Sequence, residues 1–192
     1  MKIIISVILL FVVYSAKTQS NDIGSGISLN FNGVTGNYID LGDVYNTLSF
    51  PFTIEAWINP TAAPGNRGSI IGSDNDLINY RGFWFRLTNT LKLDYEIGDG
   101  LGSGPSDRRG YVTSESVPLN TWTHIAIVAN SATDVTFYFN GRLISKVSSG
   151  GGATNTVLLH SSASAIIGWS ENMHEPFPFP GQIDEVRLWN IA

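Results

Sequence analysis

Aromatic and polar side chains gather in one short segment near the end of the sequence, WSENMHEPFPFPG at positions 169–181. Three rings, Trp169, Phe177 and Phe179, occur there close to His174 and Glu175. The prolines between them hold the segment extended, so little conformational freedom is left to lose on binding. Aromatic rings pack against the C–H face of a sugar while carboxylates and amides bind its hydroxyls. The segment therefore predicts a sugar-binding rim.

An earlier loop is expected to complete this rim with Tyr80 and Arg81. The alternative is that Phe177 and Phe179 only cover an open end of the domain. The predicted ligand-binding residues are Tyr80, Arg81, Trp169, His174, Glu175, Phe177 and Phe179.

A second polar pattern lies in LKLDYEIGD, residues 91–99, where Lys92, Asp94 and Glu96 alternate with apolar residues. Glycoside hydrolysis needs two carboxyl groups about 5–9 Å apart, which neighbouring positions on one strand face can supply. The simpler interpretation is a solvated strand face, and we expect no enzyme activity. The three histidines are widely separated and cysteine is absent, so a zinc site is not predicted.

The chain that must position these residues has 192 residues, 11 basic and 16 acidic side chains, and a net charge of −5. It has no basic stripe of the kind that nucleic-acid binding requires. From residue 26 onward, short β-branched or aromatic runs alternate with Gly, Asn, Pro and Asp. Such strands with frequent turn signals predict one all-β domain, a sandwich or barrel, over residues 21–192.

Two local patterns are specific enough to predict geometry. Asn140-Gly141 separates two alternating runs and predicts a hairpin with a type I′ turn. Alternation in residues 52–59 and 183–189 gives each strand an aliphatic and a mixed face. If these two strands pair, Glu55 is expected to meet Arg187 beneath neighbouring tryptophans, as a structural pair.

The N-terminus predicts an export signal over residues 1–20. Lys2 is followed by the short apolar run 3–13 and then by small residues. Eleven apolar residues are too few to cross a bilayer, which takes about 20. We therefore expect a secreted protein with no membrane contact after signal cleavage.

Five ordered motifs carry a resemblance to a known group. LNFNG with YIDLGD, FTIEAWINP, NTWTHIAIVAN with VTFYFNGRLI, IIGWS, and PGQIDEVRLWN resemble laminin-G-like, concanavalin A-like jelly-roll domains, the group that includes pentraxins. The resemblance covers about residues 27–191. It implies a two-sheet antiparallel jelly-roll sandwich, commonly with calcium, and a role in binding carbohydrate or protein.

The resemblance also implies metal ligands. Asp74 and Asn75 match an Asp-Asn pair that supplies calcium ligands in pentraxins, and the loop with Glu171, Asn172 and Glu175 resembles a second ligand segment. Calcium takes six to eight oxygen ligands, which these side chains could partly supply. The alternative is an acidic turn and an unrelated polar loop.

A structural calcium is also common in this group near the start of the last strand. Asp184 would hold it together with the turn at Phe31-Asn32-Gly33, where Asn32 replaces the usual Asp. Alternation places Asp184 on the side of Val186 and Leu188, where a carboxylate needs a partner. The alternative is that Asp184 accepts backbone N–H bonds.

The resemblance and the residues together predict a secreted, non-catalytic, calcium-assisted module that binds a glycan or cell-surface polymer. In the glucanases of this fold, a nucleophilic glutamate takes the position of Lys92, which argues against that chemistry. The alternative function is a structural or adhesive domain that contacts other domains of a modular extracellular protein.

Overall fold

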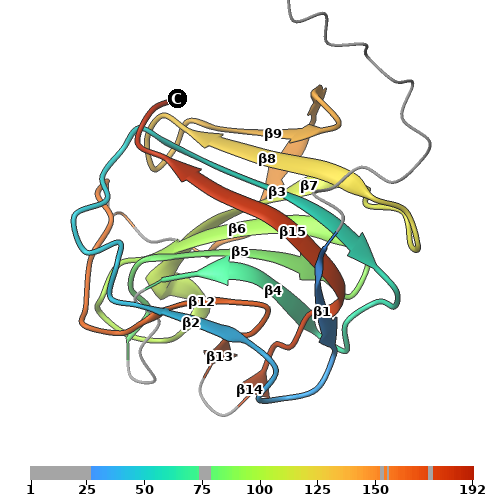
Figure 1. Ribbon diagram of the computed structural model, residues 1–192. Coiled ribbons are helices and arrows are strands. Elements are labelled where there is room, and N and C mark those ends of the chain that lie inside the picture. Colours follow the sequence, from blue (N-terminus) through green and yellow to red (C-terminus); the bar gives the residue numbers. More distant parts are fainter. Residues whose placement is uncertain (1–26, 74–78, 152–153, 155, 173–174) are drawn as a thin grey trace, which may run out of the picture.

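A computed structural model describes residues 27–192, except 74–78, 152–153, 155 and 173–174. The described residues form strands joined by turns, with one short 3-10 helix, η1 (Pro105–Asp107). Two antiparallel sheets lie face to face (Figure 1). The all-β jelly-roll prediction is confirmed. The predicted signal peptide lies outside the described residues. Within them, none of the helical structure is long and apolar enough to cross a membrane.

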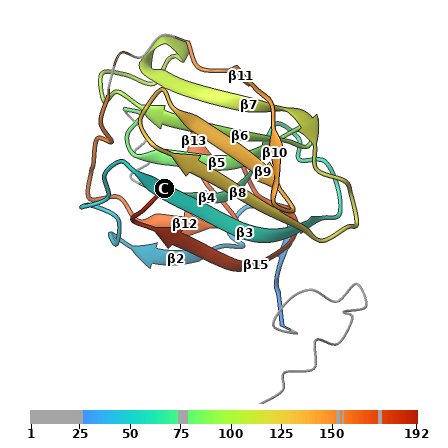
Figure 2. The same cartoon turned by 90° about the horizontal axis from the view of Figure 1, so that it is seen from above.

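The first sheet has six strands in the order β1-β15-β3-β8-β9-β10. Strands β15, β3, β8 and β9 lie side by side in both views of the molecule (Figures 1 and 2). Their bounds are β1 (Leu29–Asn32), β15 (Pro180–Trp189), β3 (Phe52–Pro60), β8 (Thr123–Ala129), β9 (Val135–Phe139) and β10 (Arg142–Ile144).

The second sheet has seven strands in the order β11-β7-β6-β5-β4-β12-β2. Their bounds are β11 (Lys146–Ser148), β7 (Arg108–Ser116), β6 (Lys92–Gly98), β5 (Phe83–Thr88), β4 (Arg67–Gly72), β12 (Ala165–Ile167) and β2 (Ile39–Gly42). A two-stranded hairpin, β13 (Glu171–Asn172) and β14 (Glu175–Pro176), stands apart from both sheets.

The core lies between the two sheets and follows from the alternation of each strand. On β3, every second residue from Phe52 to Ile58 is fully buried, and β5 buries Phe83 and Phe85 in the same way. The rings of Phe52 and Phe83, one from each sheet, lie 5.9 Å apart. Burial of each such side chain contributes about 1.5–3 kcal/mol to the free energy of folding. The other half of each strand is left to face outward, and there the two sheets differ.

The hairpin predicted at Asn140-Gly141 is present between β9 and β10. Asn140 has φ 49° and Gly141 has φ 76°, as a type I′ turn requires. The register pairs Phe139 with Arg142 across the turn. This turn fixes the position of Asn140 beside His124 of β8.

The alternation predicted for the last strand is wrong because β15 contains a bulge. The register pairs Asp184 with Trp57 and Arg187 with Glu55, so β15 has one extra residue, and Glu185 takes φ 49°. Ile183 is therefore buried, while Asp184 shares the outer face with Trp57. Asp184 does not need a cation to offset burial in the core. Its Oδ1 accepts a bond of 2.8 Å from the Glu185 N–H.

Candidate functional site

The outer surface of the six-stranded sheet presents three of the five tryptophans of the chain. Trp57 lies opposite His124, and Glu55 lies opposite Arg187. Directly paired residues share a sheet face, so these side chains stand together. We call the surface formed by Glu55, Trp57, Trp122, His124, Arg187 and Trp189 the aromatic face.

Glu55 lies at the centre of the aromatic face and contacts three of its side chains. Its Oε1 accepts a bond of 3.0 Å from Trp189 Nε1 and lies 3.5 Å from Arg187 Nη1. Its Oε2 lies 3.1 Å from His124 Nε2. The predicted meeting of Glu55 with Arg187 is present. Because one carboxylate fixes three neighbours, the surface is arranged before any ligand arrives.

A hollow of about 380 Å³ opens in the aromatic face, lined by Trp57, Trp122, His124 and Asn140. The rings of Trp57 and His124 lie 5.3 Å apart at an angle of 56°. The Asn140 side chain accepts a 2.9 Å bond from the His124 N–H, and the Asn140 N–H donates 2.8 Å to the His124 carbonyl. The type I′ turn thus fixes one wall of the hollow.

The chemistry of this hollow suits a small amphipathic ring. Its volume falls within the range of about 300–1,000 Å³ typical of ligand sites. Indole rings offer flat apolar walls, while imidazole and amide groups offer hydrogen bonds. In the described part of the chain, no three or more His, Asp or Glu side chains are grouped as a metal site requires.

The predicted rim is largely buried. Phe177 is 2% exposed and Phe179 is fully buried, the latter within the core between the sheets. Tyr80 is 5% exposed and packs edge-on against Trp84 at 5.2 Å. The prediction that these three rings present a sugar-binding surface is wrong, because all three are buried. Phe179 is part of the core, and Phe177 covers Arg86 on the outside of the sandwich.

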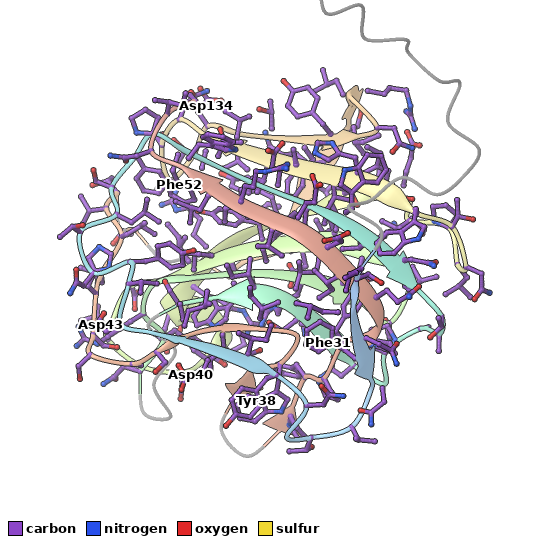
Figure 3. All side chains as sticks on the ribbon, in the orientation of Figure 1. Phe31, Tyr38, Asp40, Asp43, Phe52 and Asp134 are labelled. Atoms are coloured by element: carbon purple, nitrogen blue, oxygen red, sulfur yellow. The ribbon has the colours of Figure 1, made fainter. Side chains whose placement is uncertain are left out.

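Trp169 remains partly exposed and stacks on Tyr38 with ring centroids 5.3 Å apart. Tyr38 is 44% exposed and lies at the end of the molecule near β13 and β14 (Figure 3). Arg81 Nη1 donates 3.3 Å to the His160 carbonyl. His174 lies outside the described residues, as does the side chain of Glu175, so their predicted roles stay predictions.

The calcium ligands predicted at the two loops are not described. Asp74 and Asn75 lie outside the described residues, and so do the side chains of Glu171, Asn172 and Glu175. The calcium prediction for these loops therefore stays a prediction.

The predicted structural calcium between Asn32 and Asp184 does not fit the register. Asn32 pairs with Pro180, which is four residues, or about 13 Å, along β15 from Asp184. The Asn32 side chain accepts a 3.2 Å bond from the Val34 N–H instead. The two side chains do not converge on one ion, because they are separated along the strands.

Asp94 and Glu96 do not form a solvated strand face, as their sequence pattern suggested. They point outward from β6 but are 0% and 1% exposed. Arg86 on β5 bonds to both, with its Nη2 2.8 Å from Asp94 Oδ2. Arg67 adds a second contact of 2.9 Å to Asp94, and Arg108 Nε lies 3.1 Å from Glu96 Oε1. We call Arg67, Arg86, Asp94, Glu96 and Arg108 the buried charge cluster.

Later parts of the chain cover this cluster. The Phe177 ring lies 5.7 Å from the Arg86 guanidinium, and the Ser149 hydroxyl donates 3.3 Å to Asp94. Burial raises the pKa of Glu96, although Arg86 opposes the rise. Burial alone would lower the pKa of Arg86, but Glu96 and Asp94 outweigh it and raise the pKa. Carboxylates that are enclosed and paired in this way are poorly placed to act on a substrate.

The sequence pattern predicts a structural role for Glu55 and Arg187 beneath neighbouring tryptophans, and it predicts no binding role for His124. A usable signal was present in Trp122 and His124, which stand two residues apart and so share a strand face. The missing step was the pairing of β3 with β8, which brings Trp57 opposite His124.

Comparison with known proteins gives one family match. The family model described as the concanavalin A-like lectin/glucanases superfamily matches residues 32–192. A search of curated proteins found no significant match.

Several solved structures share the fold. The CBM40 of the Ruminococcus gnavus IT-sialidase, bound to α2,3-sialyllactose, has a TM-score of 0.63 at 14% identity, covering 85% of this chain and 89% of that one. Domain 4 of the Geobacillus stearothermophilus GH43 arabinanase AbnA, in complex with arabinotriose, has a TM-score of 0.53 at 23% identity, covering 84% and 69%. A heptameric SAP-like pentraxin from Limulus polyphemus has a TM-score of 0.54 at 16% identity, covering 86% and 76%.

Proposed function

The chain belongs to the concanavalin A-like lectin/glucanase superfamily, and from this premise we propose that it is a non-catalytic carbohydrate-binding module whose glycan lies on the aromatic face. The observation that carries the proposal is the hollow between Trp57, Trp122, His124 and Asn140. A pyranose can stack on an indole wall there while its hydroxyls reach the imidazole and the amide. Two structural neighbours carry sialyllactose or arabinotriose, which supports this class of ligand.

The absence of catalysis is part of the proposal and is supported by the buried charge cluster. Asp94 and Glu96 are the paired carboxylates that the sequence offers for glycoside hydrolysis, and both are enclosed. Glu55 on the open face is already bonded to three side chains. A retaining or inverting mechanism needs two accessible carboxyl groups flanking the scissile bond.

Secretion and a calcium ion also belong to the proposal. Secretion is supported by the signal-like residues 1–20, and calcium by the oxygen-rich loops at 74–76 and 171–175. An ion that binds only the folded state must raise stability by mass action. Thermal melting in millimolar calcium and in EDTA tests it. Equal melting temperatures would remove calcium from the proposal and leave the aromatic face untouched.

The experiment for the main proposal is a glycan array with wild-type protein, followed by calorimetry on the best glycan with two variants. Trp57→Ala removes a wall of the hollow, and Trp169→Ala removes another partly exposed tryptophan, from the predicted rim. We expect Trp57→Ala to abolish measurable binding and Trp169→Ala to retain it, with folding checked by circular dichroism. Dimers in solution that bury Trp57, with no glycan bound, would favour the adhesive-domain alternative.

A further inference from the structure

The aromatic face is longer than its hollow. Trp189 is 47% exposed and pairs with Thr53, four residues along β3 from Trp57. Four residues of a strand span about 13 Å. A single sugar ring in the hollow leaves Trp189 without a ligand contact. A chain of sugars that runs along the strands would reach it.

Contacts within the face connect the two ends. Glu55 lies between the hollow and Trp189 and bonds to His124 on one side and to Trp189 Nε1 on the other. The indole of Trp189 is therefore held in place although its ring is open to solvent. A fixed, exposed aromatic ring is a favourable stacking surface, since little side-chain entropy remains to be lost.

The charges of the face argue against an acidic ligand. Arg187 donates to Glu185, and its Nη1 lies 3.5 Å from Glu55 Oε1, while Asp184 lies opposite Trp57 on the same face. Two carboxylates thus share the charge of one arginine, and Asp184 adds a third negative charge to the face. A sugar carboxylate or sulfate placed there would meet like charge, whereas neutral hydroxyls can use the carboxylate oxygens as acceptors.

We propose that the aromatic face binds the internal part of an extended, uncharged polysaccharide, with one sugar unit in the hollow and a later unit on Trp189. This inference rests on the proposed function, because it names the ligand class of the same site. It differs from recognition of a terminal acidic sugar such as the one in the sialyllactose carried by a structural neighbour.

The test is calorimetry with neutral probes of two lengths, the disaccharides and tetraoses of the cello, xylo and manno series, and with sialyllactose as the acidic probe. We expect at least one neutral tetraose to bind, and sialyllactose to bind more weakly. Trp189→Ala should weaken tetraose binding about tenfold, the value of one aromatic contact, and weaken disaccharide binding much less. Trp57→Ala should abolish both.

Two failures are distinguishable. Binding that depends on Trp57 but is equal for disaccharide and tetraose, or is tighter for sialyllactose, overturns the extended neutral ligand and keeps the proposed function. Glycan binding that survives Trp57→Ala, or no binding of any probe, overturns the proposed function and the inference with it.

Discussion

The outer faces of the two sheets use the same kinds of residues with opposite outcomes. On the seven-stranded sheet, Arg86 pairs with Asp94 and Glu96 at about 1% to 4% side-chain exposure. On the six-stranded sheet, Arg187 pairs with Glu55 at 44% and 21%. The first group is covered by Phe177 and bonded to Ser149, whereas the second stays open. Covered charges can stabilise only the fold, whereas exposed charges between tryptophans can contact a ligand.

The largest expected effect is a loss of stability when Arg86 is removed from the buried charge cluster. Arg86→Ala leaves Asp94 and Glu96 buried with reduced compensation, which costs about 3–5 kcal/mol of unfolding free energy. Arg187→Ala is the matched change on the open face and should cost less than about 1 kcal/mol. Urea unfolding of both variants measures the difference. Equal losses of unfolding free energy in the two variants would show that the covered and the open ion pairs stabilise the fold to the same extent.

The next largest expected effect is a loss of glycan affinity when Trp57 is removed from the aromatic face. Trp57→Ala removes an indole wall of the hollow and should abolish measurable glycan binding, a loss of at least about 2–4 kcal/mol, as loss of a central binding residue does. Its fold should persist, because Trp57 lies outside the core between the sheets. Calorimetry and a melting curve on the same sample separate the two effects. A variant that melts normally and binds like wild type would contradict the proposal.

A smaller effect is expected at the carboxylate that fixes the open face. Glu55→Ala frees His124, Arg187 and Trp189 and should weaken glycan binding by about 1 kcal/mol. Glu55→Gln keeps the shape and an acceptor oxygen, so it should fall between the alanine variant and wild type. Identical affinities for all three proteins would mean that fixing these side chains adds nothing to binding.

The smallest effect concerns pH and the covered cluster. Burial raises the pKa of Glu96 above its ordinary value of 4.5. The associated stability is present below the unfolded pKa and is lost as pH rises through the folded pKa. The unfolding free energy of wild type relative to Glu96→Gln should therefore fall as pH rises above 4.5. A rise with pH instead, measured by urea unfolding, would contradict this sign.

The sequence was sufficient for the fold and for local pairings. Alternation predicted the buried side of β3, and Asn140-Gly141 predicted its turn, because both depend on residues adjacent in sequence. The pairing of Glu55 with Arg187 followed from the family topology.

The sites were not predictable in the same way. The bulge at Glu185 needs a left-handed φ at a residue with no glycine-like signal, and it moves Asp184 to the other face. Asp94 and Glu96 have the alternation of an open face, but Phe177, about 80 residues later, and Ser149 cover the cluster they form. Local pattern decides which face a residue takes, whereas distant segments decide whether that face is open.

The most direct test of the account is a two-dimensional NMR titration that follows the five tryptophan indole N–H signals while a neutral tetraose is added. Trp57 and Trp122 line the hollow, Trp84 is 2% exposed beside the covered cluster, and Trp169 stacks on Tyr38. We expect the Trp57, Trp122 and Trp189 signals to move and those of Trp84 and Trp169 to stay unchanged. Movement of Trp169 with Trp57 and Trp122 unchanged would contradict this expectation.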